Sequence, residues 1–241
     1  MARLKLEKVK EEISTAGFTL VSEDYKNLET PLKIKCKEGH IFFNSLKEIR
    51  SGVTCSDCEK IENKEITNKL NKKDKGVIRT LAIDQSTHKN GFAIFDNKKL
   101  IYSSFFSTNG DEAIERISHV KKWLIESIEK WNLDIVAIED IQLQVYGNRS
   151  QVSTYKVLAH LQGVLLETAF IQKTPMHVIH VKTWRSYIGI TSKKREDAKR
   201  EARIKVKNRY GLNVTDDEAE AVCIGRYVVE KYLQNNQMFN F

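Results

Sequence analysis

Residues 77–107 read VIRTLAIDQSTHKNGFAIFDNKKLIYSSFFS and indicate the fold of the larger part of the chain. Residues 77–84 are an apolar strand that ends in Asp84, and a second apolar strand, residues 91–96, follows after a polar turn. A tight Asp-Asn turn then leads into a third strand, residues 99–107. Strands joined by short polar turns usually pair as antiparallel neighbours, so this stretch predicts three adjacent strands of one sheet.

Beyond these strands, helical and strand patterns alternate. Apolar residues recur at helical spacing in four segments, and two short apolar runs separate them. The expected elements are helices at residues 111–131, 151–170, 193–210 and 216–234 and strands at residues 134–140 and 176–181. This order predicts an α/β fold in which a mixed five-stranded sheet is flanked by helices.

The composition narrows the class of protein. The chain has 241 residues, of which 41% are apolar and 30% are charged. This balance excludes collagen-like, disordered and disulfide-scaffold proteins. No apolar run reaches the roughly 18 residues that a membrane span needs. The opening residues, MARLKLEKVKEE, lack the apolar core of a signal peptide. We therefore expect a soluble, cytoplasmic protein with no membrane segment.

The positive charge of the chain is concentrated in one segment. Residues 182–209 hold eleven Lys or Arg and three Asp or Glu, an excess equal to the net charge of +8 for the whole chain. Such a segment is typical of proteins that bind the phosphate backbone of nucleic acids, and a solvated lysine-rich helix is the structural alternative. The pattern favours nucleic acid as a partner.

A polar stretch divides the chain near residue 75. Residues 59–75, EKIENKEITNKLNKKDK, contain only three aliphatic residues and indicate a charged linker or solvated helix. We therefore expect an accessory domain at residues 1–58 and a larger domain at residues 76–241.

Three of the four cysteines and one histidine form the pattern Cys36-x3-His40-x14-Cys55-x2-Cys58. This spacing is typical of a tetrahedral Zn2+ site, and in a reducing cytoplasm disulfides are not expected. Residues 31–58 offer few apolar side chains, so bound Zn2+ would contribute folding free energy. Four protein ligands leave no open position, which indicates a structural site in a small zinc-finger domain.

Residues 17–58 resemble the small zinc-binding modules of phage-encoded and homing-type nucleases. The resemblance is carried by the C-x3-H and C-x2-C frame and by the KIKCKEGHIF core. It implies an accessory module that contacts DNA, and the residues themselves leave a protein partner open. Cys223 lies outside this frame, in the apolar run AVCIGRYVV, and is expected to be a buried core thiol.

Acidic residues end two apolar strands and open the last helix. Asp84 ends the first strand and Glu139 the fourth, so both would emerge at one sheet edge if these strands are parallel neighbours. In TDDEAEA, Asp217 and Glu220 are spaced i, i+3 and share one helix face. Each acid alone has an ordinary role as a turn former or helix cap. Together they predict a site for divalent cations such as Mg2+, which can activate a water and stabilise a leaving 3′ oxygen in phosphodiester hydrolysis.

The same segments resemble the RuvC-type Holliday-junction resolvases, most closely their Gram-positive phage branch, over residues 78–229. The matching motifs are LAIDQST, GFAIFD, IVAIEDIQLQ, LAHLQGVLLE, HVKTWRSYIGI, KKREDAK and DDEAEAVCIG. The resemblance implies an RNase H-like fold, a homodimer and four carboxylates that bind Mg2+ or Mn2+. Carried over by motif, these carboxylates are Asp84, Glu139, Asp217 and Glu220.

The resemblance also assigns roles outside the carboxylates. Lys182 matches a family lysine near the scissile phosphate. In RuvC-type enzymes the loop equivalent to residues 141–150 reaches the crossover, which makes Tyr146 and Arg149 candidates for stacking and phosphate contact. The DNA-binding candidates of the basic segment are Lys182, Arg185, Lys193, Lys194 and Arg195. The family has Asp at the last acidic position, so the choice among Asp216, Asp217, Glu218 and Glu220 stays open.

These observations predict a metal-dependent endonuclease that cuts branched DNA, with the four-way junction as the first candidate substrate. A junction has approximate two-fold symmetry, so paired incisions call for a homodimer. One alternative is a DNA-binding module without activity, because Glu220 replaces the family's Asp. Another is an actin-like nucleotide-binding ATPase, whose first phosphate loop IDQST fits, although the glycine-rich second loop is missing.

Overall fold

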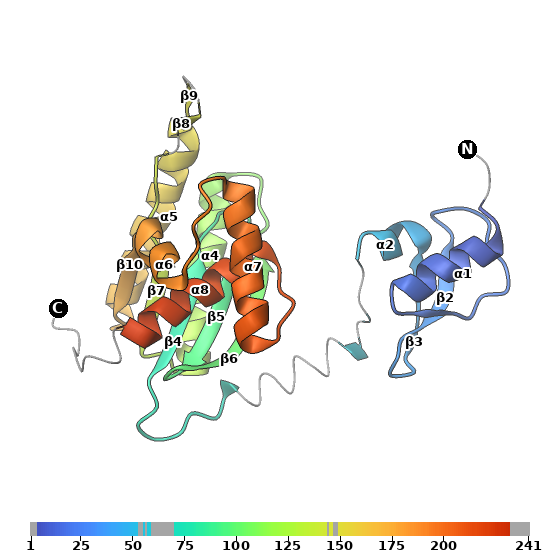
Figure 1. The fold of residues 1–241 in the computed structure, drawn as a ribbon, viewed down its shortest axis with the longest axis horizontal. Coiled ribbons are helices and arrows are strands. Elements are labelled where there is room, and N and C mark those ends of the chain that lie inside the picture. The colour runs from blue at the N-terminus through green and yellow to red at the C-terminus, as the bar shows by residue number, and fades with distance from the viewer. Residues whose placement is uncertain are drawn as a thin grey trace. The chain divides into compact units, whose positions relative to one another are not determined.

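The computed structural model describes residues 4–52, 55, 57–58, 70–143, 145–146 and 149–231, with the backbone alone at residues 145–146 and 149–150. The chain divides into two compact units, Met1–Lys69 and Leu70–Phe241, each described here by itself (Figure 1). Residues 59–69 of the expected linker lie outside the described residues. Within the described part, none of the helices has the length and apolar character needed to cross a membrane.

The first unit is a small antiparallel sheet covered by helices. Its elements are α1 (Leu6–Thr15), β1 (Thr19–Leu20), β2 (Pro31–Lys35), β3 (Ile41–Ser45) and α2 (Leu46–Arg50), and the strand order is β1-β2-β3. The buried core residues are Val9, Ile13, Tyr25, Leu32, Ile34, Leu46 and Ile49. The amphipathic helix α1 therefore supplies apolar surface that residues 31–58 lack.

The second unit contains the mixed five-stranded sheet that the sequence predicts, with strand order β10-β7-β4-β5-β6. The strands are β4 (Arg79–Asp84), β5 (Lys89–Asp96), β6 (Lys99–Ser107), β7 (Ile135–Glu139) and β10 (Met176–Ile179). The first three in the chain pair antiparallel, whereas β7 lies parallel to both β4 and β10. The predicted fold class is thus confirmed.

Helices cover both faces of this sheet (Figure 1). They are α4 (Ala113–Trp131), α5 (Val152–Ile171), α6 (Val181–Ile188), α7 (Arg195–Tyr210) and α8 (Asp216–Lys231). Helix α4 packs on one face, where Trp123 and Trp131 contact Phe92, and α5 packs against α4 and β10. Helix α8 packs on the opposite face and contacts α6 and α7. The short hairpin of β8 (Val145–Tyr146) and β9 (Arg149–Ser150) precedes α5.

The last strand is shorter than the expected residues 176–181, because the chain turns into α6 at Val181. The imidazole of His180 accepts a hydrogen bond of 3.2 Å from the backbone amide of Lys182 and caps the helix. Trp184 and Ile188 lie one turn apart and are buried, so apolar periodicity favours the helix at this point.

The face of the sheet that α8 covers is built from small residues. Ala82 of β4 pairs with Ala93 of β5 and with Ala137 of β7, so three alanines form a row across three strands. All three are fully buried in one cluster with the apolar residues of α8. Small side chains in register let a helix lie close to a sheet.

Two glycines bring α8 closer still. Gly91 of β5 lies under the first turn of α8, where a β-carbon would overlap the backbone carbonyl of Asp217. Gly225 lies over β5, where a β-carbon would overlap the ring of Phe95. Glycine at both contacts therefore fixes how closely the acidic end of α8 approaches the sheet.

The second unit begins at Leu70, which is buried. The guanidinium group of Arg79, fully buried at the start of β4, donates to the backbone carbonyl of Leu70 and forms an ion pair of 2.6 Å with Asp96. Lys73 pairs with Asp134 at 2.5 Å. Residues 70–75, which the sequence analysis places in the linker, are therefore bound to the second unit.

We expect Gly91→Ala to destabilise the second unit by about 1–3 kcal/mol, because the added methyl group must displace the start of α8. Urea unfolding of the purified chain, followed by tryptophan fluorescence, measures this change. All three tryptophans of the chain lie in the second unit.

Gly163→Ala is the matched control. A β-carbon at Gly163, on the exposed side of α5, meets no atom within 4 Å. Its replacement should be neutral or stabilise the helix by up to about 1 kcal/mol. Equal stability of Gly91→Ala and the parent chain would contradict the close approach of α8.

Candidate active site

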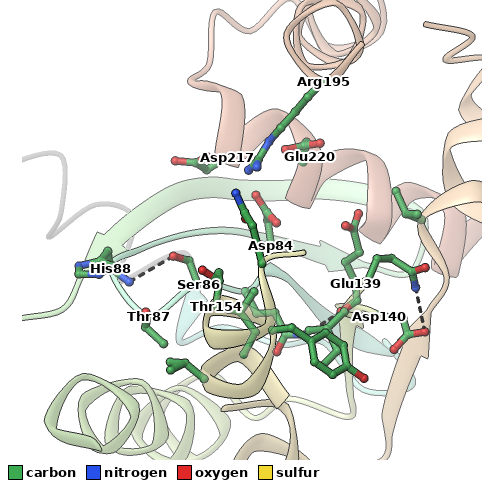
Figure 2. A pocket seen from close by; sticks show the side chains of 18 of the residues that line it. Asp84, Ser86, Thr87, His88, Glu139, Asp140, Thr154, Arg195, Asp217 and Glu220 are labelled. Carbon is green, nitrogen blue, oxygen red and sulfur yellow. Dashed lines mark hydrogen bonds between the residues drawn. The ribbon is translucent and has the colours of Figure 1, made fainter. Parts of the chain in front are cut away.

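Four carboxylates from three elements lie together at one edge of the sheet. Ile83 pairs with Ile138 in the parallel register, so Asp84 and Glu139 are neighbours at the ends of β4 and β7. Figure 2 shows both rising from the sheet toward Asp217 and Glu220 on α8. The four side chains line a cleft of about 1020 Å³.

The alternating pleat explains why the acids share a face. Ala82 and Asp84 are two residues apart on β4, as are Ala137 and Glu139 on β7. Side chains two apart point to the same side of a sheet, so both acids face the side that α8 covers. Glu220 on α8 is only 5% exposed.

Burial and like charge raise the affinity of these acids for protons. Desolvation raises the pKa of Asp84 well above its usual range, and the three neighbouring carboxylates raise it further. Desolvation and the charge of Glu220 raise the pKa of Glu139 to about 7. The indole N–H of Trp184 donates to Glu139 Oε2 at 2.8 Å and partly offsets this rise.

Three basic residues form ion pairs with the acids that α8 contributes to the cleft, and the most distant of them is Lys89, whose Nζ lies 3.9 Å from Asp217 Oδ2. Arg185 Nη2 donates to Glu220 Oε1 at 2.8 Å. Lys199 Nζ lies 3.3 Å from Asp217 Oδ1 and 3.7 Å from Glu220 Oε2. Desolvation lowers the pKa of Lys199, but these carboxylates raise it by more, so the ammonium form is favoured.

The other acids of the first turn of α8 have different partners. Asp216 pairs with Arg203 at 3.2 Å. Glu218 Oε2 accepts hydrogen bonds from the backbone amide and hydroxyl of Thr215, at 3.0 and 2.9 Å, and completes a capping box. Of the four acids left open by the sequence, Asp217 and Glu220 are therefore the pair that lines the cleft.

A glutamine pair holds the loop that follows β7. Gln85 Nε2 donates to the backbone carbonyl of Glu139 at 2.7 Å and to Gln162 Oε1 at 3.0 Å. Gln162 Oε1 also accepts from the backbone amide of Ile141 at 3.3 Å. This network connects β4, β7 and α5 beneath the acids.

Two known structures with TM-scores above 0.5 share this arrangement of elements. The Thermus thermophilus RuvC in complex with Holliday junction substrate matches with a TM-score of 0.52 and 17% identity, over 66% of this chain and 97% of that chain. A second T. thermophilus RuvC structure matches with a TM-score of 0.51 and 19% identity, over 65% of this chain and 97% of that chain. The yeast mitochondrial Holliday junction resolvase Ydc2 matches with a TM-score of 0.47 and 12% identity, over 97% of this chain and 96% of that chain. The fold is RNase H-like, as in RuvC. No family model and no curated protein matches the sequence.

At 17% and 19% identity the likeness to RuvC shows the fold alone. The candidate site is therefore inferred from the residues of this chain. Most of the basic candidates line the cleft, namely Arg185, Lys193, Lys194 and Arg195. Figure 2 shows Arg195 reaching from the start of α7 toward Asp217 and Glu220. Lys182 is exposed at the start of α6 and is not among the described residues that line the cleft. The side chains of Tyr146 and Arg149 lie outside the described residues.

Sequence reasoning missed the groups that support the acids. Lys199 is one of eleven basic residues in its segment, and only its packing beside α8 distinguishes it. Trp184 and the two glutamines lie inside the quoted motifs, but their contacts depend on elements distant in sequence. Helical spacing of Trp184 and Ile188 is the one signal that could have located α6.

The predicted cysteine and histidine cluster is assembled in the first unit. The ligand atoms of Cys36, His40, Cys55 and Cys58 all lie within 4.8 Å of one another. The sulfurs of Cys36 and Cys58 are 3.6 Å apart, and His40 Nδ1 is 3.2 Å from the sulfur of Cys58. A tetrahedral Zn2+ with bonds of about 2.0–2.3 Å separates its ligands by about 3.3–3.8 Å, so the spacing fits this ion.

The pKa of the Cys36 thiol differs from the pKa values of Cys58 and Cys223. Desolvation raises the pKa of both Cys36 and Cys58, but a shared hydrogen bond favours the thiolate of one, so the pKa is about 7 for Cys36 and about 12 for Cys58. Cys223 is 2% exposed in α8, which confirms it as a buried core thiol. Its pKa is raised to about 12, chiefly by burial.

Without bound cations, Asp84→Asn should stabilise the protein near neutral pH. A raised carboxyl pKa means that the folded chain binds protons more tightly than the unfolded chain, so stability falls as pH rises from 4.5 toward about 7 for Glu139. Asparagine carries no charge, so Asp84→Asn removes both the desolvation cost of the Asp84 carboxylate and its repulsion by the neighbouring acids. The melting temperature at about pH 7.5 should rise by roughly 2–4 °C per kcal/mol gained, and the gain should shrink at about pH 5.

The measurement uses buffer passed over a chelating resin, with no soluble chelator, so that metal at the cysteine cluster is retained. Asp74→Asn removes an exposed acid of the same unit and should leave the pH profile unchanged. A lower melting temperature for Asp84→Asn at about pH 7.5 would show that repulsion does not dominate this site.

Proposed function

We propose that the chain is a metal-dependent, structure-specific endonuclease that resolves four-way DNA junctions and related branched DNA. The observation that carries this proposal is the convergence of Asp84, Glu139, Asp217 and Glu220 in a cleft with basic residues on its wall. An anionic centre beside cationic side chains suits a phosphodiester substrate, because the cations attract the backbone and the acids bind metal. One of the RuvC structures of similar fold holds a Holliday junction substrate.

The donor set fits Mg2+ or Mn2+. Hard divalent cations prefer carboxylate oxygens, and the four acids supply them from three separate elements. Desolvation first, and the neighbouring carboxylates second, raise the pKa of Asp84 and Glu139, and bound cations would counter both effects by favouring the ionised acids. Cations held by Asp84, Glu139, Asp217 and Glu220 would supply the activation of water and the charge that stabilises a leaving 3′ oxygen in phosphodiester hydrolysis.

The side chains of this chain have complementary roles around the acids. Arg195, Lys193 and Lys194 are exposed at the start of α7 and bind phosphates of the incoming strand. The exposed hydroxyls of Ser153 and Thr154, in the first turn of α5, face the same cleft and contact the backbone from the other wall. Arg185 and Lys199 hold the acids of α8 in place.

We also propose that the chain acts as a homodimer. Paired cuts in a two-fold symmetric junction call for two active sites. The core does not use all apolar residues of α5, since Leu166, Phe170 and Ile171 are 38%, 84% and 61% exposed. These residues lie on the C-terminal half of the helix and form a candidate contact between subunits.

Finally, we propose that Cys36, His40, Cys55 and Cys58 bind a structural Zn2+. All four ligand atoms come from protein, so the ion has no open position for catalysis. It would connect the end of β2 with the segment that follows α2.

Asp217→Asn should abolish cleavage of a labelled four-way junction in Mg2+, with a loss of at least about 1000-fold, because it removes a metal ligand. Junction affinity should stay equal or increase, since a negative charge near phosphate is lost. Gel assays of cleavage and binding measure both. Asp84→Asn should behave in the same way.

Asp216→Asn is the matched control on the adjacent residue. Its carboxylate pairs with Arg203 and does not line the cleft, so cleavage should stay within about threefold of the parent chain. Loss of binding together with cleavage in Asp217→Asn would contradict the metal-site role. Tight junction binding by the parent chain with no cut in Mg2+ or Mn2+ would favour the inactive binding module.

Purified protein should contain one Zn2+ per chain, and Cys55→Ser should lose it. The first unit should then become sensitive to protease while the second stays folded. Metal analysis and limited proteolysis measure the two effects. Cys223→Ala removes a buried thiol outside the cluster and should retain the metal. Unchanged zinc content in Cys55→Ser would refute the assignment.

A further inference from the structure

The outer face of the sheet in the first unit carries exposed apolar side chains. Leu32 and Ile34 point into the core, so the alternate residues of β2 and β3 point outward. Ile41 is 50% and Phe43 64% exposed, large values for apolar residues in strands. The residues of this outer sheet face are Thr19, Val21, Lys33, Lys35, Ile41 and Phe43.

Each exposed apolar residue of β3 lies opposite a lysine. Lys33 pairs with Phe43 across the strands, and Lys35 pairs with Ile41. Directly opposed residues of an antiparallel pair have β-carbons about 4.5–5.5 Å apart, so each lysine side chain starts beside an apolar neighbour on the same face. The face therefore alternates cationic and apolar groups.

Within the part of the chain that the structure describes, the lysines of this face have no acidic partner. The outer sheet face contains no acidic residue, and among the described residues no ion pair involves Lys33 or Lys35. Elsewhere in the unit, Lys47 pairs with Glu29 and Arg50 with Glu12. The basic groups of the outer sheet face thus remain available to an anionic partner.

We propose that the outer sheet face binds unpaired bases of DNA, with a base stacked on Phe43 and the flanking phosphates contacted by Lys33 and Lys35. An open sheet that presents an aromatic ring beside basic residues suits this ligand, because every base has a face that can stack. A protein partner is less suited, since the centres of protein interfaces are depleted in lysine. The inference rests on the proposed function for DNA as substrate and adds unpaired bases as the ligand of the first unit.

The test uses the full chain and a labelled oligothymidylate of about 12 nucleotides, a length within the site sizes of single-strand binding domains. Fluorescence anisotropy without divalent cations measures affinity without cleavage. Phe43→Ala should weaken binding by about 5- to 100-fold, the range expected for loss of one stacked base. Phe43→Tyr keeps an aromatic face and should restore most of the affinity.

A lysine pair gives a second variant that does not alter the apolar surface. Replacing Lys33 and Lys35 by Gln should flatten the salt dependence by roughly 0.7 log units for each lost phosphate contact. Lys5 and Lys10, exposed on or beside α1, provide the control pair. Their replacement by Gln should leave the slope unchanged, and an equal effect of both pairs would overturn the proposal.

Crosslinking locates the contact directly. An oligonucleotide with 5-iododeoxyuridine should crosslink under ultraviolet light to the tryptic peptide of residues 38–47, and Phe43→Ala should abolish this product. Crosslinks confined to the second unit would overturn the assignment. The assignment would also be overturned if duplex DNA bound as tightly as the oligothymidylate and if Phe43→Ala weakened the binding of both equally.

The outcomes separate this inference from the proposed function. Oligonucleotide binding that depends on Phe43, without junction cleavage by the parent chain, would support the inference and contradict the nuclease. Junction cleavage by the parent chain, with unchanged oligonucleotide affinity of Phe43→Ala, would support the nuclease and overturn the inference.

Discussion

The close contact between α8 and the sheet is the constraint on which the candidate active site depends. Gly91 is paired with Asp84 across β4 and β5, and the backbone carbonyl of Asp217 lies directly over Gly91. The end of β4 and the first turn of α8 are therefore positioned by one contact between backbones. The row of alanines beneath the helix offers no large side chain that would hold α8 away from the sheet. A larger side chain at these positions would lift the helix and separate the carboxylates that it brings to the cleft.

The same contact makes the site electrostatically costly. Bringing acids together at a partly desolvated edge raises the pKa of Asp84 and Glu139, so ionising them opposes folding. Arg185 of α6 and Lys199 of α7 offset part of this cost at Glu220 and Asp217. The layer of helices that positions the acids thus also supplies their nearest counter-charges. A divalent cation bound between these acids would favour their ionised form in the folded chain. Metal binding would therefore stabilise the second unit.

How much the sequence predicts depends on whether a feature is local. Apolar strands that end in Asp84 and Glu139 are local patterns, and so is the helical spacing of Asp217 and Glu220, which is why the sheet and the set of acids are predictable. The partners of these acids depend on contacts between distant segments. Nothing near Lys199 distinguishes it from the other lysines of α7, and its role follows only from the packing of α7 on α8. The outer sheet face of the first unit cannot be predicted from the sequence for a similar reason, since the pairing of Lys33 with Phe43 depends on strand register.

The two proposed DNA contacts would together favour branched DNA that also carries unpaired bases, without any contact specific to a base sequence. In these proposals the cleft of the second unit binds backbone phosphates, which every duplex offers, and the outer sheet face of the first unit binds unpaired bases, which an intact duplex hides. A substrate that offers both can occupy both sites of one chain, and the second contact then forms at high effective concentration. Duplex alone or single strand alone occupies one site and gains no such advantage. Selectivity for such a branch would therefore follow from the combination of two individually unselective sites, and it requires that one substrate molecule occupy both sites of a chain at the same time.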